Sequence, residues 1–451
     1  MIFRRFGTFD GGIDLPDDKE ATVAAAIAPP APVDSLRIPL APVATVAARP
    51  VVRAGDRVRA HQRLAEPADD EQVAVFAPTG GRVGRIVPVA VCTDDDGWRV
   101  CEAIELVDLD SLGGIAPGER DYDFRAADDD SLRTRLAEGG LTTHRPPVRP
   151  VTRWVADARR ASVDTLIANV MENTPFVAAD HRLLAEHGLE VIRGLTVLAR
   201  AMGAGNVMLA VDNRRTDAYA DAIPPAHLHG IQAIALAHKY PVGADPILTK
   251  VLTRREIPPG GSALDAGVAV VDAATCWAVY RWVACGLPAT GRVVTVGGPR
   301  VERAGNAYVP FGAAADAVLT AAGVGEESVS VHGSAMGGRP IPPGAVVTQV
   351  TDALLALPPA PTQPPTPCIR CGWCGTYCPA RLNVADLNDD FELGRLGHAE
   401  RRGVLACLDC GICTYVCPAR LPLAHRMLML KQVLRRHATA GDAAAAAKGA
   451  P

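Results

Sequence analysis

The chain is short of lysine, of long apolar runs and of net positive charge, and each shortage excludes a class of function. Its 451 residues contain five lysines, and none lies between Lys19 and Lys239. No apolar run reaches the ~18 residues of a membrane-spanning helix, because the most apolar stretch, 263–280, contains Asp265 and Asp272. The formal net charge is −4, which argues against a general role in nucleic-acid binding. We therefore expect neither a membrane span nor nucleic acid as a partner.

The N-terminus offers no export signal. Residues 1–6 read Met-Ile-Phe-Arg-Arg-Phe and lack the apolar core of a signal peptide. We expect the chain to stay in the reducing cytoplasm, where disulfides are rare and thiolates remain available for metal. At 451 residues it is too long for one ordinary domain, and its hydrophobic fraction of 48% is ample for several cores.

Eight of the 12 cysteines stand in two strings with the same spacing. One string occupies 368–379 and the other 407–418, and both read C-x2-C-x2-C-x3-C-P. This run holds a pair of [4Fe-4S] clusters in bacterial ferredoxins. A zinc site needs four ligands and does not explain the same rhythm occurring twice, and a disulfide framework is not expected without a secretory signal. The strings therefore predict two [4Fe-4S] clusters.

The spacing also predicts which cysteine binds which cluster. Three closely spaced thiolates on a turning backbone can each reach a different iron of one cube, while the fourth lies on the following helix and points toward the other cube. The predicted ligands of the first cluster are Cys368, Cys371, Cys374 and Cys417, and those of the second are Cys407, Cys410, Cys413 and Cys378. The other four cysteines have no ligand spacing, and we expect them to pack as small apolar residues.

The first 110 residues read as short strands separated by turns. Residues 52–58 and 77–83 place glycine turns next to apolar residues, and this pattern resembles the barrel-sandwich fold of lipoyl and biotinyl domains. Those carriers attach their cofactor to a lysine in a hairpin. The gap between Lys19 and Lys239 excludes such an arm here, so a docking module is the remaining interpretation.

Local patterns divide the rest of the chain. Residues 111–287 alternate helix-like and strand-like segments, which is typical of a parallel α/β layer. Residues 288–350 return to short β segments with glycine turns, and 351–367 form a proline-rich linker. Residues 368–437 carry the cysteine strings on helices, and the Ala/Gly-rich tail 438–451 is expected to be disordered.

Five short motifs precede the cysteine strings. They read Phe-Asp-Gly-Gly-Ile-Asp-Leu-Pro at 9–16, Asn-Val-Met-Glu at 169–172, Lys-Tyr-Pro-Val-Gly at 239–243, Pro-Pro-Gly-Gly-Ser at 258–262 and Gly-Ser-Ala-Met-Gly at 333–337. In this order and spacing, the chain resembles the RnfC family of the Rnf electron-transport complex over nearly its whole length. That family is similar to the NADH- and FMN-binding component of respiratory complex I, with a ferredoxin-like domain added.

The resemblance implies a multidomain α/β and α+β fold. A barrel-sandwich hybrid would occupy 1–110, a Rossmann-like domain 111–287, a β-grasp, soluble-ligand-binding domain 288–350, and a helical ferredoxin domain 368–437. It also implies a peripheral subunit on the inner face of the cytoplasmic membrane, which passes electrons between NADH, FMN and iron–sulfur clusters. Its partners would be the membrane subunits of an Rnf-like complex and ferredoxin or a similar electron carrier.

The stretch that corresponds to the family's glycine-rich loop, GxGGAxFP, departs from that pattern. Residues 139–147 read Gly-Gly-Leu-Thr-Thr-His-Arg-Pro-Pro. Pro146 and Pro147 remove two N–H donors that would otherwise approach phosphate. His144 and Arg145 could bind an anion in place of the loop, but we expect a solvated loop. The NADH/FMN site is therefore expected to be weakened or lost.

The next family segment, N-G-x-E-C-E-P, is matched in part. Asn169 and Glu172 agree with it, whereas Val170, Asn173 and Thr174 replace Gly, Cys and Glu. Asn169 and Glu172 are the candidate FMN contacts. The alternative, which we favour, is a turn and a polar cap at a helix N-terminus.

Three functions remain open on this basis. The first is an electron-transfer subunit of an Rnf-like NADH/ferredoxin oxidoreductase complex that relays electrons through two clusters. The second is an FMN-dependent, NADH-oxidising reductase of a soluble partner, similar to cobalamin reductase; the departing loop argues against it. The third is a docking scaffold, which the intact cysteine strings argue against.

Overall fold

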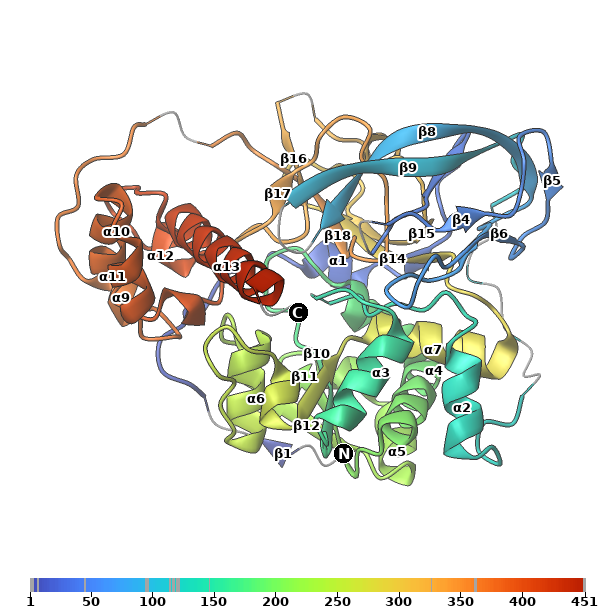
Figure 1. Ribbon diagram of the computed structural model, residues 1–451, viewed down its shortest axis with the longest axis horizontal. Coiled ribbons are helices and arrows are strands. Elements are labelled where there is room, and N and C mark those ends of the chain that lie inside the picture. Colours follow the sequence, from blue (N-terminus) through green and yellow to red (C-terminus); the bar gives the residue numbers. More distant parts are fainter. Residues whose placement is uncertain are drawn as a thin grey trace.

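The structure is a computed structural model in which several α/β and β-rich parts pack together and a helical part lies at one side (Figure 1). Residues 4–5 and the end of the last helix, 438–448, are described by their backbone alone. The described residues are 4–5, 8–43, 46–93, 97–112, 115, 118, 122–145, 147–325, 327–360 and 363–448. Pro146, one of the two prolines expected to remove N–H donors from the loop at 139–147, lies outside them.

A parallel sheet forms the centre of the predicted α/β layer. Its continuous apolar strands are typical of a sheet that is covered on both faces, and alternate side chains enter two cores, as Leu166 and Ile167 do. The strand order is β1-β12-β11-β10-β13, and all neighbours are parallel. The strands are β1 (Arg4–Arg5), β10 (Thr165–Val170), β11 (Asn206–Asp212), β12 (Gln232–Leu236) and β13 (Val268–Val271).

Helices cover both faces of this sheet. The two longest, α4 and α7, pack against each other on one face, and α6 contributes Ile247 and Leu248 to the core of the other. Helix α7 starts where the Asp272 carboxylate accepts a hydrogen bond from the Thr275 amide, an N-cap. The helices are α2 (Asp129–Leu136), α3 (Val151–Arg160), α4 (Ala179–Met202), α5 (Ile223–Leu228), α6 (Asp245–Thr253) and α7 (Ala273–Cys285), with short turns η1 (Thr216–Tyr219) and η2 (Ala263–Ala266).

Two β parts share one hydrophobic core, which the sequence did not reveal. Leu36 and Ile104 from the first part lie in the same core as Val294 and Leu354 from the second. The first part contains β3 (Leu36–Pro39), β4 (Arg49–Pro50), β5 (Arg57–Val58), β6 (Arg63–Glu66), β7 (Val75–Phe76), β8 (Gly81–Thr93) and β9 (Gly97–Val107). The second contains β14 (Gly291–Gly297), β15 (Gly305–Pro310), α8 (Ala315–Ala321), β16 (Val329–His332), β17 (Arg339–Pro340) and β18 (Ala353–Leu357).

Two segments differ from their expected assignments. Strand β18 pairs in parallel with β14, so 353–357 belong to a sheet rather than to the linker. Within the described part of the N-terminal segment, β1 pairs with β12 and β2 (Ile27–Ala28) pairs with β15, so neither of these strands joins the barrel-sandwich sheets. Between them runs α1 (Glu20–Ala24). This N-terminal segment completes the edges of two other sheets, and such long-range pairing leaves no local pattern in the sequence.

The helical part follows the linker. Its last helix continues to Lys448, so the disorder expected for 438–451 is not what the structure has over 438–448; residues 449–451 lie outside the described part. No helix in the described ranges combines the length and apolarity that crossing a bilayer requires. The elements are α9 (Trp373–Thr376), α10 (Val384–Glu392), α11 (Leu396–Arg401), η3 (Val404–Ala406), α12 (Ile412–Tyr415) and α13 (Leu423–Lys448).

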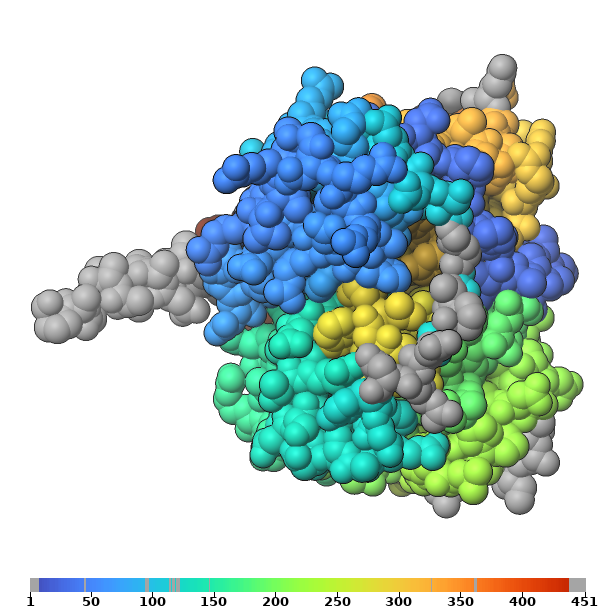
Figure 2. Space-filling model, turned by 90° about the vertical axis from the view of Figure 1, so that its right-hand side faces the viewer, coloured from blue at the N-terminus to red at the C-terminus, as the bar shows by residue number. Residues whose placement is uncertain are grey.

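The barrel-sandwich strands sit directly on the parallel α/β part, as Figure 2 shows for the blue and the teal-to-green surfaces. Arg153 of α3 forms an ion pair with Glu71 (3.1 Å) across this boundary. A Cβ on Gly140 would lie 2.6 Å from the Ala74 carbonyl oxygen. Gly140 and α3 are therefore packed closely against the barrel-sandwich part.

Candidate functional site

The two cysteine strings repeat the same backbone course. Gly372 and Gly411, at the starts of α9 and α12, have φ values of 78° and 77°. Arg370 and Asp409, at equivalent positions, have φ values of 55° and 54°. These left-handed residues turn the chain sharply twice within each string, so that three cysteine side chains can face a common point.

The first predicted ligand set lines one hollow. Its walls include all four cysteines expected to bind the first cluster, although Cys417 comes from the other string. The pKa of Cys374 is raised by burial and by the nearby charges of three other cysteines. Those three are Cys368, Cys371 and Cys417. The first group is therefore brought together in the combination that the spacing predicts.

The second set is also gathered from both strings. Burial raises the pKa of Cys410 to about 11 and that of Cys413 to about 12, and the nearby Cys378 thiolate contributes to both rises. Cys407 is half-buried near Cys410, and burial raises its pKa as well. Cys378 thus lies with the second string although it belongs to the first.

The donor chemistry fits iron–sulfur clusters. Clustered, partly buried thiolates repel one another, so they need bound cations to stay deprotonated, and cluster iron supplies that charge. Most of these cysteines pack against one apolar core formed by α10, α13 and the turns between them. Within the described residues, no group of three or more His, Cys, Asp or Glu side chains is drawn together closely enough to hold a single metal ion.

The two strings differ in what covers them. In the first, Ile369 is 66% exposed and Trp373 is 52% exposed. In the second, Ile412 stands at the position of Trp373 and is fully buried against Tyr240. The Tyr240 hydroxyl donates a hydrogen bond to the Cys410 carbonyl oxygen (2.7 Å). The first cysteine group therefore faces solvent and the second faces the α/β part.

Two of the sequence motifs, 9–16 and 239–243, form the surface against which the second group of cysteines packs, and this surface is called the seat of the second group. Gly12 donates its amide hydrogen to the Tyr377 carbonyl oxygen (2.9 Å), and Lys239 donates to the Phe9 carbonyl oxygen (2.7 Å). A Cβ on Gly11 would lie 2.6 Å from the Cys378 carbonyl oxygen. Sequence reasoning missed this role, and the adjacent glycines at 11–12 were the available signal of a close backbone approach.

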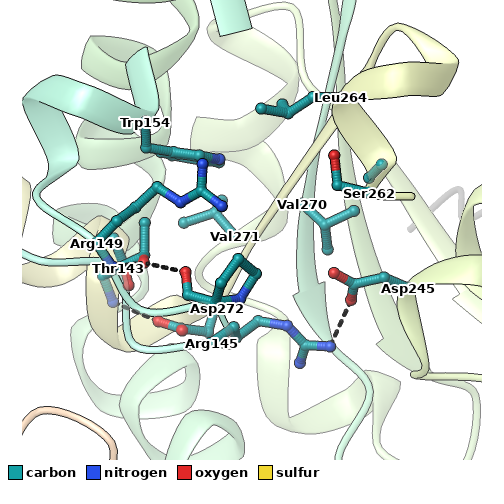
Figure 3. A pocket seen from close by; sticks show the side chains of 13 residues that line it. Thr143, Arg145, Arg149, Trp154, Asp245, Ser262, Leu264, Val270, Val271 and Asp272 are labelled. Carbon is teal, nitrogen blue, oxygen red and sulfur yellow. Dashed lines mark hydrogen bonds and ion pairs between the residues drawn. The ribbon is translucent and has the colours of Figure 1, made fainter. Parts of the chain in front are cut away.

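A small pocket lies at the carboxyl end of β13, where α/β sheets commonly bind ligands. Its volume is about 50 Å³, whereas cofactor sites typically have roughly 300–1,000 Å³. Figure 3 shows Arg145 reaching across it toward Asp245. Arg145 donates hydrogen bonds to the Asp245 carboxylate (2.6 Å) and to the Gly243 carbonyl oxygen (3.1 Å). The pocket walls also include Thr143, Arg149, Trp154, Ser262 and Asp272. As it stands, this pocket does not fit a flavin.

The candidate FMN residues lie apart from the pocket lining and bond to the backbone instead. The Asn169 side chain donates to the Gly243 carbonyl oxygen (2.8 Å) and accepts from the Met171 amide (3.0 Å). The Glu172 carboxylate accepts from the amides of Asp180 (3.0 Å) and His181 (2.7 Å) at the start of α4. This arrangement is the turn and helix cap that we named as the alternative.

The loop at 143–145 is not solvated, contrary to expectation. His144 is 7% exposed, and among the described residues neither of its ring nitrogens has a hydrogen-bond partner. Burial, with the charge of Arg292, lowers the pKa of His144 to about 3, so the imidazole is neutral. The loop turns inward because Thr275 Oγ1 accepts a hydrogen bond from the His144 amide (3.0 Å).

Three family models match successive parts of the chain. The RnfC barrel sandwich hybrid domain matches 7–106, the Nuo51 FMN-binding domain 149–281 and the 4Fe-4S dicluster domain 360–418. These matches confirm the barrel-sandwich, complex-I-like and dicluster predictions.

Curated relatives share one name, which makes each of them the C component of an "Ion-translocating oxidoreductase complex". The protein from Salmonella enteritidis PT4 (strain P125109) is 29% identical over 383 residues, covering 83% of this chain and 53% of that protein. The one from Erwinia tasmaniensis is 32% identical over 342 residues, covering 73% and 41%. The chain thus spans about half the length of the curated relatives it matches.

Among solved structures, the H2-reduced NAD+-reducing [NiFe]-hydrogenase is 16% identical with a TM-score of 0.48, covering 68% of this chain and 61% of that chain. The family resemblance rests on the sequence motifs, the family models and the curated relatives, which agree. The chain is a homologue of the RnfC proteins of ion-translocating oxidoreductase complexes.

Proposed function

We propose that this protein is an electron-transfer subunit of an Rnf-type, membrane-associated oxidoreductase complex. The observation that carries the proposal is the exchange of fourth cysteines: Cys417 lies with the first string and Cys378 with the second. Two cubes held this way lie close together in one small helical unit. The name of the curated relatives, which places them in an ion-translocating oxidoreductase complex, supports the same interpretation.

Each group of four cysteines would hold one [4Fe-4S] cluster. When bound, the clusters supply one-electron redox chemistry. The chain's own contribution is to fix the ligands and to control access to them. The first set comprises Cys368, Cys371, Cys374 and Cys417, and the second Cys407, Cys410, Cys413 and Cys378.

The exposed first group would be the point of exchange with an external carrier. Ile369 and Trp373 expose apolar surface beside Cys371, which is itself exposed. Exposed aromatic and aliphatic side chains that surround a redox centre suit a short-lived contact with a protein partner. Ferredoxin or a similar carrier, and the membrane subunits of the complex, would be these partners. Ion translocation requires a membrane, so the protein would bind peripherally at its cytoplasmic face.

The NADH/FMN site would be weakened or lost. The Nuo51-type domain is present, but Arg145 and its ion pair with Asp245 occupy the small pocket at the end of β13. Asn169 and Glu172 are committed to backbone hydrogen bonds. We therefore derive no electron entry through a flavin in this chain.

The division of the chain would follow that of the family. Residues 1–110 would be the barrel-sandwich domain, 111–287 the Rossmann-like domain and 288–350, extended by β18, the β-grasp domain. The antiparallel pair β14–β15, the crossing helix α8 and the parallel pairing of β18 with β14 support a β-grasp arrangement. The linker and the helical ferredoxin domain, 368–437, would follow.

One purification tests the proposal. Protein isolated without oxygen should contain about eight irons and about eight sulfides per chain, and far less than one FMN. Dithionite or reduced ferredoxin should bleach the cluster absorption, whereas NADH should not. Stoichiometric zinc without sulfide would defeat the cluster assignment.

The match to the FMN-binding domain favours a second candidate, an FMN-dependent, NADH-oxidising reductase of a soluble partner. One FMN per chain, together with bleaching by NADH, would establish that function. Such a result would require Arg145 to leave the pocket when the flavin binds.

A further inference from the structure

The two cysteine strings carry opposite charges at one equivalent position. Arg370 follows the first cysteine of its string by two residues, and Asp409 does so in the second string. Arg370 forms ion pairs with Asp386 and Asp389 of α10, and its side chain is 55% exposed. Asp409 instead pairs with Lys431 of α13 (2.5 Å).

Lys431 is the unusual member of this set because its charge is buried. Its side chain is 4% exposed, and its Nζ donates a hydrogen bond to the carbonyl oxygen of Cys407 (2.6 Å). Burying an ammonium is costly unless it is paired and hydrogen-bonded, and both partners here belong to the second string. The buried cation is thus fixed against the backbone of a proposed ligand of the second cluster.

We propose that Lys431 is a positioning residue that raises the reduction potential of the second cluster relative to the first. The inference rests on the proposed function, which makes Cys407 a cluster ligand. A cluster gains one negative charge on reduction, so a nearby cation stabilises the reduced form. Asp409 opposes this effect only in part, because its side chain is 42% exposed and solvent screens its charge more strongly.

The test is a potentiometric titration, followed by electron paramagnetic resonance, of the anaerobically purified full chain. Cys371→Ala removes the first cluster and so identifies the signal of the second. In Lys431→Met, the second cluster should have a reduced-to-oxidised ratio about tenfold lower than wild type at any fixed potential, which equals a shift of about 59 mV for one electron. Lys431→Arg keeps the positive charge, so the midpoint of its second cluster should stay close to that of the wild type.

Two matched variants separate charge from structure. Asp409→Asn keeps Lys431 and removes its counter-charge, so the midpoint of the second cluster should rise. Arg370→Met removes the equivalent, exposed cation of the first string and should leave the second midpoint unchanged. If Lys431→Met fails to assemble the second cluster, the double variant Lys431→Met/Asp409→Asn, which leaves neither member of the ion pair unpartnered, takes its place and should still lower the midpoint, because Asp409 offsets Lys431 only in part.

The outcomes distinguish this inference from the proposed function. A wild type without two titrating clusters would refute both. Two clusters whose midpoints are unchanged in Lys431→Met, or in the double variant where it is needed, would overturn the role of Lys431 and leave electron transfer intact.

Discussion

The cysteine strings keep every ligand type that the family pattern calls for, whereas the pocket at the end of β13 is small and is crossed by an ion pair. A cluster site depends on a few cysteines at fixed local spacing. A flavin site depends on open volume shaped by several loops. In this structure the pocket at the end of β13 is about 50 Å³, and Arg145, bonded to Asp245, lies across it. A site that needs open volume therefore depends on more of the chain than a site that needs only ligands at a fixed spacing.

The two residues of the α/β part that match the family motif, Asn169 and Glu172, stabilise the fold of that part. Asn169 and Glu172 satisfy buried backbone groups after β10 and at the start of α4. Their removal would leave amides without partners, at a cost of roughly 1–3 kcal/mol each. Agreement with a family motif at these positions thus reflects folding and does not by itself indicate a flavin.

The largest expected difference between the two regions is in iron content. Cys371→Ala should lower the iron from about eight to about four per chain, because one cube loses a ligand. Arg145→Ala, in the closed pocket, should leave the iron at about eight. Iron and sulfide analysis of both anaerobically purified variants makes the comparison. Equal iron loss in both would mean that the two regions do not act independently.

The packing of the second cysteine string against Met336, which lies in one small apolar cluster with Tyr240 and Ile412, can be disturbed at Gly411. A Cβ there would lie 2.2 Å from the Met336 carbonyl oxygen, whereas in the described part of the chain nothing lies within 4 Å of a Cβ on Gly372. Both glycines have positive φ, so alanine adds a similar backbone strain of about 1–2 kcal/mol at either site. Only Gly411→Ala should also force the second string away from its seat.

Hydrogen exchange measures that loosening. If the clash costs about 1.4 kcal/mol more than the strain alone, amides at 239–243 should exchange about tenfold faster in Gly411→Ala than in Gly372→Ala. The iron content of both variants should be reported beside the exchange rates. Equal exchange at 239–243 in the two variants would show that this contact does not hold the regions together.

Local sequence patterns predicted the cysteine strings in detail but the pocket at the end of β13 only in outline. The cysteine spacing specified which side chains meet, because each string folds as one turn-helix unit, and the alternation over 111–287 indicated the parallel layer. The departures at 139–147 indicated a changed pocket. They did not show Arg145 entering it, because Asp245 lies a hundred residues away and its pairing is decided by tertiary packing.

Long-range pairings account for most of the remaining differences. The pairing of Arg4–Arg5 with β12, the shared core of the two β parts and the seat built from Gly11 and Gly12 all join segments that are distant in sequence. Such contacts leave no periodic pattern. The continuation of α13 through 438–448 was also missed, since an Ala/Gly-rich tail was read as disordered although alanine favours helix.

The last prediction concerns the inward-turning loop at 143–145 and depends on pH. His144 has a folded-state pKa of about 3 because it is buried, whereas an unfolded histidine has a pKa of about 6.5. The unfolded chain therefore binds a proton that the folded chain refuses between these values, so this residue makes stability fall as the pH drops below about 6.5. At pH 5 the loss is about 2 kcal/mol.

His144→Leu keeps an apolar side chain in the loop and removes the titrating group. Its melting temperature should therefore fall less than that of the wild type between pH 7.5 and pH 5.0. Above pH 7.5 the histidine is neutral in both states, so the variants should show a constant offset there, which serves as the internal control. Other buried histidines, such as His181 and His332, have pKa values lowered by burial in the same direction, but they are present in both proteins and cancel. Identical pH dependence in the two proteins would mean that His144 is protonated in the folded state, and hence that the loop opens to solvent and the pocket can enlarge.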